Sequence, residues 1–146
     1  MRLYVDTSVL VAAHTHEPQT QIAQAWLAVD AGDLLVSAWT LLECESALAI
    51  KLRRGELTGA GRSEAIAGID TFVAQSAPVI VPTEADFQRS RELCRHAASR
   101  LRAGDSLHLA IALRVKATHF AALDQVLATN AAVHGFAMPT SPGRST

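Results

Sequence analysis

The sequence lacks the features that would mark a membrane-bound or exported protein. It has no apolar run close to the roughly 20 residues that a membrane-spanning helix needs. Its first residues show none of the charged, apolar and small-residue regions of an export signal. We therefore expect a cytoplasmic protein without a membrane partner. The formal net charge of the 146 residues is only −1, so overall charge gives no indication of nucleic-acid binding.

Cysteine is scarce, and glycine-rich nucleotide-binding motifs are missing. The only two cysteines, Cys44 and Cys94, lie in helical patterns without a second Cys or a His at metal-ligand spacing. We expect both to be reduced thiols without a chemical role. The "GAG" at 59–61 neither follows a strand pattern nor matches GxGxxG or a P-loop, which argues against nucleotide cofactors of those kinds.

Short apolar, β-branched segments alternate with longer helical patterns, which is typical of βαβ units around a parallel sheet. We predict one α/β domain over residues 1–138 and a flexible tail over 139–146. The domain is expected to be a three-layer α/β/α structure with a short central parallel sheet of about five strands. The predicted strands cover 3–5, 34–37, 79–81, 118–122 and 135–138, and the predicted helices cover 7–13, 20–30, 39–53, 58–76, 84–99, 105–116 and 124–133.

Carboxylates stand where the functional site of such a sheet is expected, beyond the carboxyl ends of the strands. Asp6 follows the first predicted strand and Asp124 follows the fourth. Each also fits the N-cap of the next helix, and both interpretations stay open. Asp105 leads an apolar helical stripe shared with His108, so it is either another N-cap or a group that points into a polar cavity.

A further acid is expected from the helix at 39–53, which carries Glu43 and Glu45. Residues two apart are separated by about 200° around a helix, so only one of them can face a site. Because this helix is apolar nearly all round, its periodicity does not choose between them. Several carboxylates crowded together repel one another unless a cation is present, and oxygen ligands suit Mg²⁺ or Mn²⁺. Such ions support phosphodiester hydrolysis by activating water.

Histidines and basic clusters give weaker indications. His108 either hydrogen-bonds within the core or lies near the site, and we favour the structural position in the core. We place His14 and His16 in a surface loop without metal. The basic clusters fit solvated helix faces or contacts with RNA phosphates, and the two possibilities stay open. They comprise Lys51, Arg53 and Arg54, and then Arg89, Arg91, Arg95, Arg100 and Arg102.

Four acidic blocks resemble those of the PIN-domain ribonucleases, in particular the VapC-type toxins of bacterial toxin–antitoxin pairs. They are "YVDTSVLVA", "LLECESALAIKLRRGEL", "GDSLHLAIAL" and "AALDQVLA", in this order over nearly the whole chain. The resemblance implies a PIN-like fold and a cytoplasmic endoribonuclease that depends on Mg²⁺ or Mn²⁺. It also implies a homodimer that is held inactive by a VapB-like antitoxin.

The same resemblance assigns the site residues. The family's four acids, which bind metal and carry catalysis, match Asp6, Glu43, Asp105 and Asp124. Thr7 and Ser8 match hydroxyl positions of the family, one of which commonly supports the metal shell, and we favour Ser8. The chain departs from the family pattern at two positions: Ala122 replaces a frequent Thr or Ser, and Glu45 adds an acid. The second departure leaves open a change of register between Glu43 and Glu45.

Two other functions fit parts of this pattern. A phosphoryl-accepting signalling domain also gathers acids around Mg²⁺, but the sequence lacks its acidic pair before Asp6 and its lysine late in the sheet. A non-catalytic PIN-like RNA-binding module is the other alternative, since a fold does not fix a function.

Overall fold

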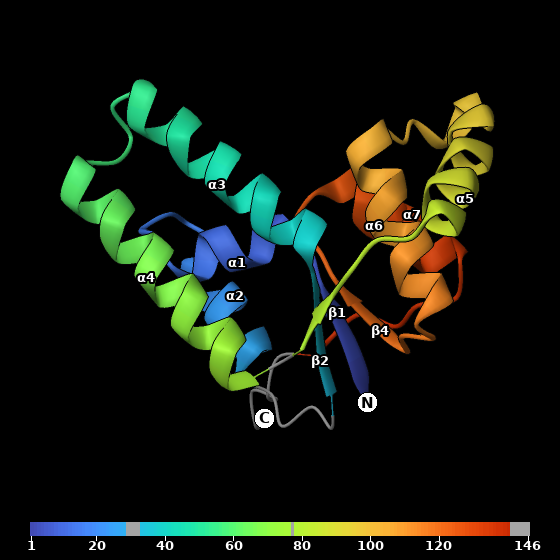
Figure 1. Cartoon of the computed structure of the whole chain (residues 1–146), viewed down its shortest axis with the longest axis horizontal. Coiled ribbons are helices and arrows are strands. Elements are labelled where there is room, and N and C mark those ends of the chain that lie inside the picture. Colours follow the sequence, from blue (N-terminus) through green and yellow to red (C-terminus); the bar gives the residue numbers. More distant parts are fainter. Residues whose placement is uncertain (29–32, 77, 141–146) are drawn as a thin grey trace, which may run out of the picture.

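A computed structural model describes residues 1–28, 33–76 and 78–140 of the chain. It shows the predicted alternation of short strands and longer helices (Figure 1). In chain order the elements are β1 (Arg2–Val5), α1 (Thr7–Ala13), α2 (Thr20–Leu27), β2 (Asp33–Ser37), α3 (Ala38–Arg53), α4 (Gly59–Ser76), β3 (Val79–Ile80), α5 (Glu84–Arg95), a 3₁₀ helix η1 (Ala97–Ser99), α6 (Ala103–Arg114), β4 (His119–Ala121) and α7 (Gln125–Val133).

The sheet is parallel, with strand order β3-β2-β1-β4. β1 lies inside the sheet, where Tyr4 is opposite Leu35 of β2 and Phe120 of β4. A strand covered on both faces is expected to be apolar throughout. Leu3, Tyr4 and Val5 are all fully buried. Asp6 follows the carboxyl end of β1 and therefore lies at the carboxyl-end edge of the sheet, between β2 and β4.

Helices cover both faces of the sheet, which confirms the predicted three-layer α/β/α architecture (Figure 1). Successive side chains of a strand point to opposite faces. Leu3 and Val5 belong to the core cluster shared with α1 to α4, whereas Tyr4 belongs to the cluster shared with α5, α6 and α7. In Figure 1 the two helical layers lie on either side of the strands.

The predicted fifth strand at 135–138 is wrong, and four strands form the described sheet. Ala137 makes an isolated bridge to His119, and its carbonyl accepts a hydrogen bond of 3.0 Å from the Phe120 N–H. Gly135 has a φ of +90° in the turn after α7, and the side chain of Phe136 is buried. Because the turn and this core contact come directly before Ala137, only one residue reaches strand register.

The helices differ from the predictions mainly at their ends. α6 begins at Ala103, before the predicted start at 105, and α5 ends at Arg95, before the predicted end at 99. His96 leaves the helical conformation there, with φ −80° and ψ 83°. The predicted helix at 20–30 corresponds to α2, which ends at Leu27; residues 29 and 30 of the prediction lie outside the described part. The division between a domain at 1–138 and a tail stays a prediction, because residues 141–146 also lie outside the described part.

Two further predictions concern membranes and cysteines. Over the described residues, no helix combines the length and the apolar character that crossing a membrane requires. Cys44 and Cys94 are free, as expected for reduced thiols. Burial raises the pKa of the Cys44 thiol to about 12, and the negative charges of Asp6 and Glu43 act in the same direction. Cys44 is therefore held as an unreactive thiol.

Candidate active site

Asp6 is both a helix cap and a site residue, so the two interpretations of the sequence are compatible. It is the N-cap of α1, and its Oδ2 accepts hydrogen bonds from the Ser8 N–H at 3.2 Å and the Ser8 hydroxyl at 2.7 Å. The Ser8 Oγ in turn accepts a hydrogen bond of 3.0 Å from the Leu123 N–H. Ser8 thus fixes the Asp6 carboxylate and ties it to the segment that leads into Asp124.

Glu43 reaches the same place from α3. Its Oε1 accepts a hydrogen bond of 2.7 Å from the Thr7 hydroxyl and a second one from His108 Nε2. Burial favours the neutral acid, but these hydrogen bonds outweigh it and lower the pKa of the Glu43 carboxyl. Glu43 is therefore a carboxylate, fixed by donors from α1 and α6.

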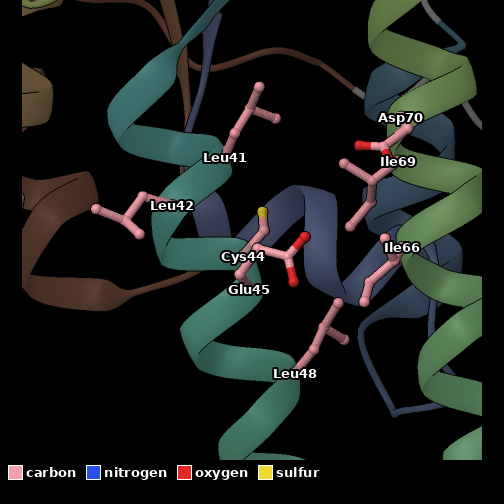
Figure 2. Close-up of a pocket in the computed structure, with 8 residues that line it drawn as sticks. All are labelled: Leu41, Leu42, Cys44, Glu45, Leu48, Ile66, Ile69 and Asp70. Atoms are coloured by element: carbon pink, nitrogen blue, oxygen red, sulfur yellow. The ribbon is translucent and has the colours of Figure 1, made fainter.

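Glu45 lies in a different environment. It is exposed and lines a cleft between α3 and α4, with Leu48, Ile69 and Asp70 (Figure 2). In Figure 2 its carboxylate points toward α4, and it does not line the pocket that contains Glu43. Of the two glutamates of α3, the structure therefore places Glu43 with Asp6.

Asp105 is not a helix cap. The N-cap of α6 is Arg102, and Asp105 is the third residue of the helix, where it is half-buried. Burial, together with the negative charges of Asp6 and Asp124, raises the pKa of Asp105 to about 6. The side chain thus points into a polar cavity that it shares with other acids, the second of the two sequence interpretations.

Asp124, like Asp6, is both a helix cap and a site residue. It follows β4 and is the N-cap of α7, where its Oδ1 accepts a hydrogen bond of 2.9 Å from the Leu127 N–H. It is exposed and lines the same pocket as Asp105. Ala122 is buried and offers no hydroxyl to this carboxylate. Asp124 is therefore held by its own helix.

All four predicted acids line one open pocket of about 700 Å³. They come from β1–α1, α3, α6 and β4–α7, and the structure brings them together at one edge of the sheet. The complete lining consists of Asp6, Thr7, Ser8, Glu43, Arg100, Arg102, Gly104, Asp105, Asp124 and Val126. Asp6, Glu43 and His108 each offer one ligand atom within 4.8 Å of the others. An oxygen-rich set of this kind fits a hard divalent cation, which would relieve the repulsion between the carboxylates.

His108 combines the two positions that the sequence leaves open, because it is buried in the core and also hydrogen-bonds to an acid of the pocket. The side chain is fully buried, yet Nε2 lies 3.2 Å from Asp6 Oδ1 and bonds to Glu43. The stripe that His108 shares with Asp105 was the signal for this position. His14 differs from its prediction: it caps the C-terminus of α1, and its Nδ1 donates to the Leu10 carbonyl at 2.7 Å.

Two arginines of the predicted basic segment reach the acidic pocket. Arg100 and Arg102 line it, and Arg100 adopts the left-handed backbone conformation with φ +63°. Arg89 instead pairs with Glu92 on the surface of α5, and Lys51 pairs with Glu17 and Glu56. These pairs fit the solvated-face interpretation of the clusters. The cationic rim of the pocket thus comes from the loop before α6.

Comparison with known proteins identifies the family. A model of the PIN domain matches residues 3–133, which include all four acids. The chain belongs to the PIN domain family. This membership favours the nuclease interpretation of the acidic blocks over a phosphoryl-accepting domain. No curated protein sequence matches the chain.

Solved structures share this PIN fold. VapC20 of Mycobacterium tuberculosis, described as a toxin that cleaves the sarcin–ricin loop, has a TM-score of 0.74 at 20% identity, over 96% of this chain and 99% of that one. VapBC2 of Rickettsia felis, bound to a DNA fragment from its promoter, has a TM-score of 0.66 at 13% identity, with coverages of 94% and 97%. FitAcB of Neisseria gonorrhoeae has a TM-score of 0.65 at 18% identity, with coverages of 95% and 97%.

Proposed function

We propose that this PIN domain is a divalent-metal-dependent endoribonuclease that hydrolyses RNA phosphodiester bonds in the cytoplasm as the toxin of a toxin–antitoxin pair. The observation that carries the proposal is the gathering of Asp6, Glu43, Asp105 and Asp124 in one open pocket. Four carboxylates with no lysine among the lining residues suit metal-assisted hydrolysis better than chemistry by a side-chain nucleophile.

The four acids would hold Mg²⁺ or Mn²⁺. Their oxygens are the ligands that such ions prefer. The raised pKa of Asp105 reflects its burial and then the negative charges of Asp6 and Asp124, and a cation would relieve the repulsion between these charges. When bound, the metal supplies Lewis-acid stabilisation of the phosphoryl oxygens and activation of water. Ser8 and Thr7 keep Asp6 and Glu43 turned into the pocket through their hydrogen bonds. The protein thus contributes a pre-arranged set of oxygens.

Arg100 and Arg102 would bind the RNA backbone at the rim of the pocket. Both line it, and their charges offset the repulsion between an acidic site and a phosphate. Contacts of this kind position a nucleic acid without reading its sequence. We propose that they place one phosphodiester over the acids.

The expected protein partners are a second copy of the chain and a VapB-like antitoxin. An apolar side chain remains exposed next to the site, where Phe87 has 53% of its surface accessible. Phe87 lines an apolar groove with Trp39 and Leu107, and the groove meets the acidic pocket at Gly104. An exposed apolar surface beside a charged site supports a protein partner.

Removal of the metal tests the proposed activity. Purified full-length protein is incubated with single-stranded and structured RNA in the presence of Mg²⁺ or Mn²⁺, with EDTA in a parallel reaction. We expect internal cleavage with either ion, no cleavage with EDTA, and recovery when Mg²⁺ is added in excess over the chelator. Cleavage that continues undiminished in EDTA would reject the metal-dependent mechanism.

Gly104→Ala is expected to weaken metal binding without weakening the fold. A Cβ at position 104 would lie 3.0 Å from Glu43 Oε2 and 3.4 Å from Trp39 Cζ2, so the Glu43 carboxylate must move. Alanine is the better helix former by up to about 1 kcal/mol. We expect unfolding temperatures at or above those of the wild type, with about a tenfold loss in Mn²⁺ affinity and RNA cleavage.

Gly59→Ala is the matched control for this prediction. Gly59 opens α4, and a Cβ there meets nothing within 4 Å. The control receives the same gain in helix propensity and no contact with the site. If Gly104→Ala binds Mn²⁺ and cleaves RNA as well as Gly59→Ala does, the position of the Glu43 carboxylate is not important for the site.

A further inference from the structure

His108 is a buried polar residue of α6 whose two ring nitrogens contact two different parts of the protein. Nδ1 lies 2.8 Å from the Tyr4 hydroxyl of β1. Nε2 forms a hydrogen bond with Glu43 Oε1 and lies 3.2 Å from Asp6 Oδ1. The side chain has no exposed surface. The imidazole therefore connects the core of the sheet to the acidic pocket.

The partners of the ring determine which atoms donate. A carboxylate accepts hydrogen bonds and donates none, so Nε2 carries a hydrogen and donates a hydrogen bond to Glu43. The Thr7 hydroxyl donates to the same oxygen, Oε1. Oε2, the other oxygen of Glu43, lies beside Gly104, and both residues line the pocket. The two donors thus occupy one carboxylate oxygen and leave the second for an ion.

The Tyr4 side of the ring continues into a chain of buried hydrogen bonds. The Tyr4 hydroxyl lies 3.0 Å from Ser37 Oγ, which accepts a hydrogen bond of 3.1 Å from the Thr40 N–H. Tyr4, Ser37, Thr40 and His108 are all fully buried. Ser37 is the N-cap of α3, the helix that carries Glu43. This series of hydrogen bonds therefore begins at the first residues of α3, continues through Tyr4 of β1 and His108 of α6, and ends at the Glu43 carboxylate, again on α3.

Aromatic packing restrains the His108 ring and its partner Tyr4. The Tyr4 ring meets His108 edge-on, with ring centroids 5.8 Å apart, and stacks on Phe120, with centroids 5.2 Å apart. Buried polar groups that are fully hydrogen-bonded hold a unique geometry, because any rotation leaves a donor or acceptor without a partner. A ring held in this way fixes the direction of its Nε2–H bond.

We propose that His108 is a positioning residue of the nuclease site, which orients Glu43 by hydrogen bonding from Nε2 while Tyr4 holds Nδ1, and that it is not itself a metal ligand. The proposal deepens the metal-dependent function proposed above and rests on it for the RNA readout. It predicts that loss of the N–H donor weakens metal binding even though all four carboxylates remain. Outer hydrogen bonds of this kind typically contribute about 10- to 100-fold to metal affinity or activity.

The test compares full-length wild type with His108→Leu, His108→Gln and Tyr4→Phe. Mn²⁺ affinity is measured by the EPR signal of free Mn²⁺, and RNA cleavage is measured in parallel. We expect His108→Leu to lose about tenfold or more in both. His108→Gln should recover most of the loss, because its side-chain N–H can donate to Glu43. Tyr4→Phe should weaken both in the same direction, and the double variant Tyr4→Phe, His108→Leu should be no worse than His108→Leu alone.

A spectroscopic measurement separates positioning from ligation. Pulsed EPR on the Mn²⁺-loaded wild type is expected to show no strong ¹⁴N coupling from a directly bound imidazole, and such a coupling would overturn the proposal. Equal Mn²⁺ affinity in wild type and His108→Leu would also overturn it. If His108→Leu does not fold, Tyr4→Phe and the wild-type spectrum still decide. The Mn²⁺ measurements use no RNA, so a wild type that binds Mn²⁺ and cleaves no RNA would reject the nuclease function alone.

Discussion

Asp6→Asn is expected to lower metal-dependent RNA cleavage by about a thousandfold, equivalent to about 4 kcal/mol of transition-state stabilisation. The substitution removes one negative charge from the centre of the pocket, where Asp6 lies beside Glu43 and His108. It keeps an oxygen that can accept the two hydrogen bonds from Ser8. Asparagine is as good an N-cap as aspartate, so α1 should begin at the same place. Cleavage is measured from initial rates at saturating Mg²⁺, and folding is measured by thermal unfolding.

Asp70→Asn provides the matched control for this experiment. Asp70 lies on α4 at the cleft shown in Figure 2. Its substitution by asparagine is the same chemical change, placed outside the acidic pocket. We expect its cleavage rate to stay within about twofold of the wild type, since surface substitutions of this kind change the free energy of unfolding by less than about 0.5 kcal/mol. If Asp6→Asn and Asp70→Asn cleave RNA equally well, Asp6 has no part in the reaction.

Glu43→Gln is expected to reduce cleavage about a hundredfold, whereas Glu45→Gln should leave it unchanged. The amide oxygen that Glu43→Gln introduces can still accept hydrogen bonds from Thr7 and His108, so the main loss is the charge offered to the metal. Glu45 is exposed at the cleft between α3 and α4 and contributes no oxygen to the pocket. The measurement is the initial cleavage rate as a function of Mn²⁺ concentration, which separates weaker metal binding from slower chemistry.

The two glutamates control for each other, because they lie two residues apart on one helix and receive the same substitution. A loss of activity in Glu45→Gln with an active Glu43→Gln would mean that α3 presents its other face to the substrate. A loss in both variants would indicate a general effect on α3. Thermal unfolding of each variant distinguishes that effect from a loss of chemistry.

The fold could be predicted from the sequence wherever burial on both faces leaves a simple pattern. β1 is apolar because it lies inside the sheet, Asp6 follows β1 directly, and Asp124 comes three residues after the end of β4. The fifth strand could not be predicted correctly. Its apolar residues are Phe136, Ala137 and Met138, and whether they pair with β4 depends on the turn at Gly135, whose direction local sequence does not specify.

The candidate site was predictable in its composition and less so in its details. Glu43 and Glu45 looked equivalent because α3 packs on two sides: Cys44 and Leu48 face the core with α1 and α4, and Glu43 faces α6. An apolar pattern around the whole helix hides which polar residue is turned inward. Asp105 looked like a possible cap because Ala103 and Gly104 resemble a loop, yet they form the first turn of α6.

The role of His108 depends on contacts between distant segments. Its partners are Tyr4 and Glu43, which are separated from it by 104 and 65 residues in sequence. The helical stripe places His108 beside Asp105, but no local pattern says that a tyrosine hydroxyl lies behind the ring. Buried polar networks assembled across elements are therefore where sequence reasoning is weakest in this chain.

The position of β4 next to β1 determines when the acidic pocket can assemble during synthesis. β1 and Asp6 are synthesised before the other elements of the site, yet one of the two neighbours of β1 comes from residues 119–121. Asp124 follows still later. A nascent or truncated chain that ends before this point lacks both a lateral partner for β1 and one of the four carboxylates. The complete acidic pocket can thus form only after Asp124 has been synthesised and β4 has paired with β1.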